Sequence, residues 1–106
     1  TIPLGTDYPV ASNNPITTFY NAVYRPNKSW VLQSEALTRE KALKGITFWV
    51  ALANKTYESN GSLEVGKAAD FVILNRDIMK ISKDEIQTTE VIKTFVSGRV
   101  VFENMK

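Results

Sequence analysis

Apolar residues near the start of the chain recur with the period of an α-helix. Asn14 and Pro15 precede them, and these residue types are favoured at a helix N-cap and at the first helical position. The recurring apolar positions are Ile16, Phe19, Tyr20 and Val23. The pattern therefore predicts a helix that begins at Pro15 and is ended by Pro26, because proline cannot continue a helix.

A second, wider apolar stripe follows between residues 39 and 54. Thr38 is suited to cap the start of this helix, and Glu40 lies in its first turn, where a negative charge is favoured. The stripe consists of Ala42, Leu43, Ile46, Trp49, Val50 and Ala53, widened by Phe48 and Leu52. A surface helix of a small domain needs a narrower stripe. We therefore expect one continuous helix over 39–54 that is covered on more than one side.

Short apolar runs and turn residues make up the second half of the chain. Gly61 and Gly66 bracket a turn-rich stretch, since glycine permits backbone conformations that other residues resist. A continuously apolar run predicts a strand over 69–74 that is buried on both faces. Ser82, with Glu85 three residues later, is typical of a capping box. The remaining predictions are a short helix over 83–88 and a β-hairpin with strands over 91–96 and 99–103.

Together these elements predict an α+β arrangement with two structural contexts that meet near residues 55–60. Ile2 to Gly5 has the pattern of a strand end and precedes the two helices. Three strands, one of them apolar on both faces, make a poor independent sheet. Either a small α+β domain dimerises, or the rest of a larger fold is missing. The start at Thr1 without methionine indicates a processed N-terminus or part of a longer protein.

Composition excludes several classes of function. The chain has 106 residues and a net charge of +2, which is too small and too scattered for a nucleic-acid surface. No stretch is long and apolar enough to predict a membrane span, so we expect neither nucleic acid nor membrane as a partner. There is no cysteine, hence no disulfide framework and no thiolate metal site. This composition suits a reducing compartment, and a cytoplasmic location is the expectation.

The chain also contains no histidine, which limits the chemistry that it can perform alone. Zinc hydrolases of the usual kinds and serine triads both need imidazole groups. Among the carboxylates, Asp7 can either cap local amides in a turn before Pro9 or act in catalysis. Asp70 is expected to fold back onto local backbone amides before its strand, and Lys67 is expected to be solvated.

Three segments carry a resemblance to a known family. The run GSLEVGKAADFVIL at 61–74 resembles the one near the C-terminus of amidohydrolase superfamily members, where the chain leaves the catalytic barrel for a small β-sandwich. The hairpin over 91–102 is similar to that family's last two strands, and 37–43 to the helix before this run. LGTDYPV at 4–10 resembles the end of the eighth barrel strand in amidohydrolase family 3, which includes N-acyl amino-acid deacylases and formamide deformylases.

The resemblance implies that the chain is a C-terminal fragment of a (β/α)8-barrel metal-dependent hydrolase. Residues 1–56 would be the end of the barrel domain, and residues 57–106 would be part of the β-sandwich. The parent protein would hydrolyse an amide-like C–N bond of a small molecule with metal-activated water. Asp7 would contact the divalent metal, expected to be zinc, and would handle the proton of the water. The family's histidines would all lie before position 1.

The fragment alone is therefore expected to hold no metal and to be inactive. It would contact the missing barrel or self-associate through its apolar surfaces. The alternative is a non-catalytic interaction module that oligomerises through the apolar helix and strand faces. This alternative predicts a defined oligomer that buries Phe48, Leu52 and the strand over 71–74, with no dependence on metal.

Overall fold

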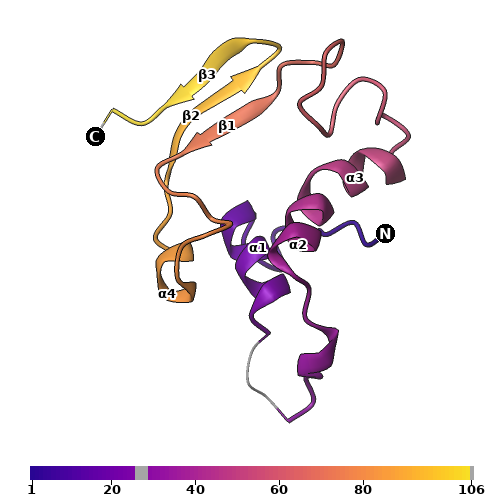
Figure 1. Cartoon of the computed structure of the whole chain (residues 1–106), viewed down its shortest axis with the longest axis vertical. Coiled ribbons are helices and arrows are strands. Elements are labelled where there is room, and N and C mark those ends of the chain that lie inside the picture. Colours follow the sequence, from indigo (N-terminus) through magenta and orange to yellow (C-terminus); the bar gives the residue numbers. More distant parts are fainter. Residues whose placement is uncertain (26–28, 106) are drawn as a thin grey trace.

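The computed structural model describes residues 1–25 and 29–105. Figure 1 shows helices α1, α2 and α3 in one part of the molecule and a three-stranded sheet standing apart from them. The chain passes from the helices to the sheet through a long segment without helix or strand between residues 54 and 70. The structure is thus a small α+β arrangement, as the sequence pattern predicts.

Helix α1 (Pro15–Val23) begins where the sequence predicts. The Asn14 side chain accepts a hydrogen bond from the amide of Ile16 at 2.9 Å, and Pro15 occupies the first helical position. The helix ends at Val23, and the amide of Tyr24 donates to the carbonyl of Tyr20 at 2.7 Å. Pro26, the predicted end of the helix, lies outside the described residues.

The predicted single helix over 39–54 is wrong, because the chain forms two helices, α2 (Arg39–Ile46) and α3 (Phe48–Ala53). They are separated at Thr47, whose φ of −128° and ψ of −91° are not helical. The Thr47 hydroxyl donates to the Leu43 carbonyl at 2.7 Å, a side-chain bond that competes with helical pairing. The predicted cap of α2 is confirmed, since the Thr38 hydroxyl accepts from the amide of Lys41.

The predicted strand end at 2–5 is also absent from the structure. A strand needs a neighbouring strand to pair with, and this segment lies beside a helix instead. The amide of Leu4 donates to the carbonyl of Gly45, near the end of α2, at 2.9 Å. In an unbroken helix that carbonyl would accept the amide of residue 49, so the break at Thr47 leaves it available.

Strands β1 (Phe71–Leu74), β2 (Val91–Val96) and β3 (Arg99–Glu103) form an antiparallel sheet in the order β1-β2-β3. The hairpin of β2 and β3 is confirmed. Ser97 and Gly98 form its turn, with φ values of 51° and 78°, as two-residue hairpin loops require. On one face Phe71 stacks on its partner Phe95, with ring centroids 4.4 Å apart.

Burial of β1 on both faces is wrong for this structure. Val72 and Ile73 remain 50% and 41% exposed, because the described part of the chain places no second layer over the sheet. The main core lies elsewhere, between α1, α2 and the segment around α4 (Lys83–Ile86). Its buried members are Ile16, Phe19, Ala42, Ile78 and Ile86.

The short helix predicted over 83–88 is present as α4, but its end and its cap differ from the prediction. Helix α4 ends at Ile86, earlier than predicted, and the side chain of Ser82 makes no capping bond. Its main-chain carbonyl instead accepts the amide of Glu85 at 3.1 Å, which is enough for a single turn.

A short 3₁₀-helix, η1 (Gln33–Glu35), follows the buried Val31. Within residues 1–25 and 29–105, no helix is long and apolar enough to cross a membrane.

Arg39 joins the N-terminal helices to the segment that follows the first strand. Its guanidinium donates to the carbonyls of Ile78 and Ile81 at 3.1 and 2.6 Å. It also donates to the hydroxyl of Tyr24 at 2.8 Å, at the end of α1. Because a guanidinium has five donors in a fixed plane, one side chain holds three segments together.

Candidate functional site

Asp7 lies in a turn at the N-terminal end of the structure, and its carboxylate is exposed. The residue has a φ of 51°, in the left-handed region, and its main-chain carbonyl accepts the amide of Val10 at 2.8 Å. Among the described residues, its carboxylate makes no hydrogen bond or ion pair. The main chain thus closes the turn and leaves the carboxylate available to a ligand or a substrate.

The loop that carries Asp7 forms one wall of a cavity of about 350 Å³. Helix α1 forms the opposite wall, and no charged side chain lines the space. The lining residues are Leu4, Gly5, Thr6, Ala11, Ser12, Thr17, Thr18, Asn21 and Ala22. Hydroxyls and one amide are the polar groups here, so this space can accept a neutral polar group beside the Asp7 loop.

The described residues do not form a complete metal site. No group of three or more histidine, cysteine, aspartate or glutamate side chains lies close enough together within residues 1–25 and 29–105 to hold an ion. Catalytic zinc sites have three protein ligands and one open position. Asp7 could supply one of these ligands, and the described part of the chain places no cluster of further ligands around it.

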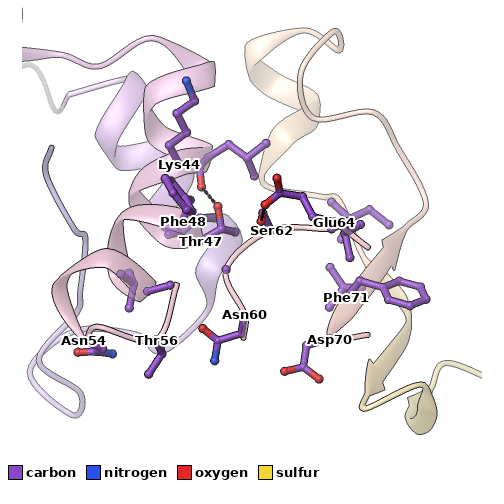
Figure 2. Close-up of a pocket in the computed structure, with 18 of the residues that line it drawn as sticks. Lys44, Thr47, Phe48, Asn54, Thr56, Asn60, Ser62, Glu64, Asp70 and Phe71 are labelled. Carbon is purple, nitrogen blue, oxygen red and sulfur yellow. Dashed lines mark hydrogen bonds between the residues drawn. The ribbon is translucent and has the colours of Figure 1, made fainter. Parts of the chain in front are cut away.

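A larger open cavity, of about 1040 Å³, lies between the helices and the sheet (Figure 2). One wall is formed by the end of α2 and by α3, and the other by residues 60–64 and strand β1. Thr47 and Phe48 line this space at the junction of α2 and α3, and Asp70 and Phe71 line it at the start of β1, where the ring of Phe71 points away from the helices in Figure 2. Most of the lining residues are apolar.

Lys67, Ser62 and Glu64 form a polar cluster beside this cavity. The ammonium of Lys67 lies 2.7 Å from the Ser62 hydroxyl and 2.9 Å from a carboxylate oxygen of Glu64. It also lies 5.4 Å from the centre of the Phe48 ring. The prediction of a solvated Lys67 is therefore wrong: its side chain is only 13% exposed, and its ammonium lies between the Phe48 ring of α3 and the loop that carries Ser62 and Glu64.

This cluster is not suited to nucleophilic catalysis. In nucleophilic catalysis a base must accept the proton of the serine hydroxyl. The ammonium of Lys67 has only hydrogen-bond donors and cannot act as this base. The Ser62 hydroxyl instead donates to Glu64 at 2.5 Å. The three side chains therefore fix the loop against α3. The i, i+3 spacing of Glu64 and Lys67 is the signal in the sequence that could have indicated this pair.

Removing the Lys67 charge should raise the pKa of Glu64. The hydrogen bonds from Lys67 and then from Ser62 hold the pKa of this carboxylate below its ordinary value. The pair is therefore intact at neutral pH and is lost as the pH falls through that lowered pKa. In Lys67→Met we expect the pKa of Glu64 to move up toward its ordinary value, measured by carbon NMR of the carboxylate. Lys44→Met, which removes the partner of Glu40, is the control and should leave Glu64 unchanged.

Asp70 has a structural role, but a different one from the local bond predicted. Its carboxylate accepts the amide of Ser97, at the turn of the hairpin, at 2.8 Å. The carbonyl of Ala69 accepts the amide of Gly98 at 3.0 Å beside it. The start of β1 thus holds the β2–β3 turn, which no pattern within 61–74 could indicate.

Comparison with known proteins gives the family. The profile of the amidohydrolase family matches residues 1–102, nearly the whole chain. The chain belongs to the amidohydrolase family. An amidohydrolase domain is of the barrel and sandwich type, and this chain is a small α+β part with three antiparallel strands.

Curated relatives of this amidohydrolase chain are much longer than the chain itself. An N-substituted formamide deformylase from Arthrobacter pascens is 29% identical over 96% of this chain and 19% of its own length. The Arabidopsis thaliana protein LONG AFTER FAR-RED 3 is 35% identical over 95% of this chain and 18% of its own length. A 5-methylthioadenosine/S-adenosylhomocysteine deaminase from Thermoanaerobacter pseudethanolicus is 31% identical over 97% of this chain and 26% of its own length.

The chain therefore spans between 18% and 26% of the length of these relatives. No solved structure shows a significant match to it. The resemblance seen in the sequence is thereby confirmed at the level of the family.

Proposed function

We propose that this chain is the C-terminal part of a metal-dependent amidohydrolase that hydrolyses amide-like C–N bonds of small molecules. Residues 1–56 would complete the end of a (β/α)8 barrel, and residues 57–106 would form part of the appended β-sandwich. The observation that carries the proposal is the family match over residues 1–102 in a chain that spans about a fifth of its relatives. The proposed boundary falls within the segment between Ala53, where α3 ends, and Phe71, where the sheet begins.

Asp7 is the residue that we propose for proton transfer. Its carboxylate is exposed and makes no bond to the described residues, as a group that must accept a proton from water requires. In the proposed reaction a carboxylate oxygen accepts the proton of the attacking water, and the same oxygen then delivers that proton to the leaving nitrogen. Catalytic residues of barrel enzymes lie at the C-terminal ends of strands, and we propose that residues 2–5 become such a strand end in the full-length protein.

The metal would be held jointly with residues from elsewhere in the full-length protein. Asp7 is the ligand that we propose from this chain, and because residues 1–25 and 29–105 contain no cluster of three such side chains, we expect the isolated chain to hold no catalytic ion. A bound divalent metal, which we propose to be zinc, acidifies a water molecule and polarises a carbonyl in such sites. Amidohydrolases generally use divalent metals, and this agrees with the family match.

The names of two relatives support a C–N bond as the target. One is a deformylase of N-substituted formamides, and the other is a deaminase. The cavity beside the Asp7 loop has hydroxyl and amide groups and no charged side chain, which suits a neutral amide.

An assay of two proteins tests this proposal. The full-length gene product, loaded with zinc, should release amine from at least one member of a panel of N-substituted formamides and N-acyl amino acids. The isolated chain 1–106 should release none under the same conditions. Folded, zinc-loaded full-length protein that hydrolyses no member of the panel would contradict the proposed substrate class. Turnover by the isolated chain would contradict the need for further ligands.

A second candidate function is a non-catalytic interaction module. It is favoured by the exposed apolar side chains of the sheet, where Val72, Val96 and Phe102 are 50%, 47% and 50% exposed. Surfaces of this kind are usually covered by another protein segment. Light scattering on the isolated chain, alone and mixed with the rest of the full-length protein, distinguishes the two functions. A defined oligomer of the isolated chain that does not depend on metal favours the interaction module. Association only with the rest of the protein favours the enzyme part.

A further inference from the structure

Gly45 and Leu4 connect the Asp7 segment to the rest of the fold. The amide of Leu4 donates to the Gly45 carbonyl at 2.9 Å. Within the described part of the chain, this is the hydrogen bond that ties residues 1–9 to the other elements, since the bond between Asp7 and Val10 is local. The position of the Asp7 turn therefore depends on where Leu4 is held.

The absence of a side chain at Gly45 is what lets Leu4 come so close. A Cβ at this position would lie 2.8 and 2.9 Å from Cγ and Cδ1 of Leu4, and 3.0 Å from the carbonyl oxygen of Ile2. Side-chain carbons do not approach one another below 3.0 Å, so a residue other than glycine requires the Leu4 side chain to shift and crowds the Ile2 carbonyl beside it. Gly45 is buried within α2 and its φ is not positive, so space and not backbone conformation is the reason for glycine here.

Glycine inside a helix costs about 1 kcal/mol relative to alanine. A glycine in α2 therefore lowers the stability of that helix, and the close contact with Leu4 is the local feature that offsets this cost. Two separate features meet at the same residue: its carbonyl, which the break at Thr47 leaves free, and its missing side chain. Both act on Leu4, three residues before Asp7.

We propose that Gly45 is a positioning residue for catalysis: it fixes Leu4 and thereby sets the place of the Asp7 carboxylate relative to the substrate. This inference rests on the proposed role of Asp7 in proton transfer. A methyl group at position 45 displaces the Asp7 turn, and misplacement of a reacting group by about 1 Å can cost about a hundredfold in rate. Leu4, Gly5 and Thr6 also line the cavity proposed for the substrate amide, so we expect KM to change together with kcat.

The test is a double-mutant cycle in the full-length, zinc-loaded protein, with a substrate from the formamide panel. Gly45→Ala should lower kcat about ten- to a hundredfold, and KM is measured beside it because Leu4 also lines the proposed substrate cavity. Leu4→Ala combined with Gly45→Ala removes Cγ and Cδ1, the two atoms that the new methyl would meet, and should regain part of kcat. Lys41→Ala, on the exposed face of the same helix, is the matched control and should keep normal kcat.

The measured kcat values of these variants decide whether Gly45 positions Asp7. Normal kcat in Gly45→Ala, or a lower melting temperature with unchanged kcat, overturns the positioning role. Effects of the two substitutions that simply add would overturn the contact on which it rests. If Gly45→Ala does not fold, Leu4→Ala alone decides, since it creates no clash: unchanged kcat overturns the inference, and a loss of about tenfold supports it. If Asp7→Asn is fully active, the proposed role of Asp7 in proton transfer fails, and the positioning role of Gly45 fails with it, while hydrolysis by the full-length protein stands.

Discussion

Replacing Asp7 by asparagine in the full-length protein should lower kcat by about 10²–10⁴-fold. The amide of asparagine has the shape of the carboxylate but cannot accept the proton of the attacking water. Asparagine also tolerates the left-handed backbone better than most residues, so the φ of 51° at this position adds little strain. The fold should therefore be unchanged, and the loss should fall on kcat. Steady-state kinetics and circular dichroism measure the two quantities.

The matched control is Asp84→Asn, which removes an exposed carboxylate of α4. It should keep normal kcat, which shows that the loss at Asp7 is not a general effect of charge. The zinc content of each variant is measured at the same time, because the asparagine oxygen can still bind a metal. Near-normal turnover in Asp7→Asn would mean that another group transfers the proton, and Asp7 would then be only a turn residue.

Local signals in the sequence predict the elements that local bonds create. The asparagine cap and the proline of α1, the threonine cap of α2 and the Ser97-Gly98 turn all act within a few residues. Each was predicted from the sequence because such signals act through their near neighbours. The candidate site residue Asp7 was also visible, but only through a resemblance, since one carboxylate in a turn is common in proteins.

Contacts between distant segments explain what the sequence pattern missed. The break at Thr47 coincides with a hydrogen bond from Leu4 to Gly45, more than forty positions apart. The pattern of apolar residues over 39–54 does not indicate that Leu4 contacts this helix. In the same way, the bond from Ser97 to Asp70 spans 27 positions, and local reasoning assigned the carboxylate to nearer amides. The prediction that β1 is buried on both faces is wrong for this structure, because burial of a strand depends on a second layer that the run of apolar residues does not specify.

Replacing Gly61 by alanine should lower the free energy of unfolding by about 2–5 kcal/mol, as the sum of two effects. The first is backbone strain, because Gly61 has a φ of +91°, where a side chain costs about 1–2 kcal/mol. The second is a clash: a Cβ at Gly61 would lie 2.5 Å from the Cβ of the buried Ala51 in α3. Overpacking of this kind typically costs about 1–3 kcal/mol. Urea denaturation of the full-length protein measures the total.

Gly66 separates the two effects, because it has nearly the same backbone and none of the crowding. Its φ is +94°, and nothing lies within 4 Å of the position of a Cβ. Gly66→Ala should therefore cost only the strain, about 1–2 kcal/mol. Hydrogen exchange should place the additional loss of Gly61→Ala in α3 and leave α1 protected. Equal losses in the two variants would show that the approach of Gly61 to Ala51 contributes nothing. A larger loss at Gly61 would show that this contact holds the segment leading to the sheet against the helices.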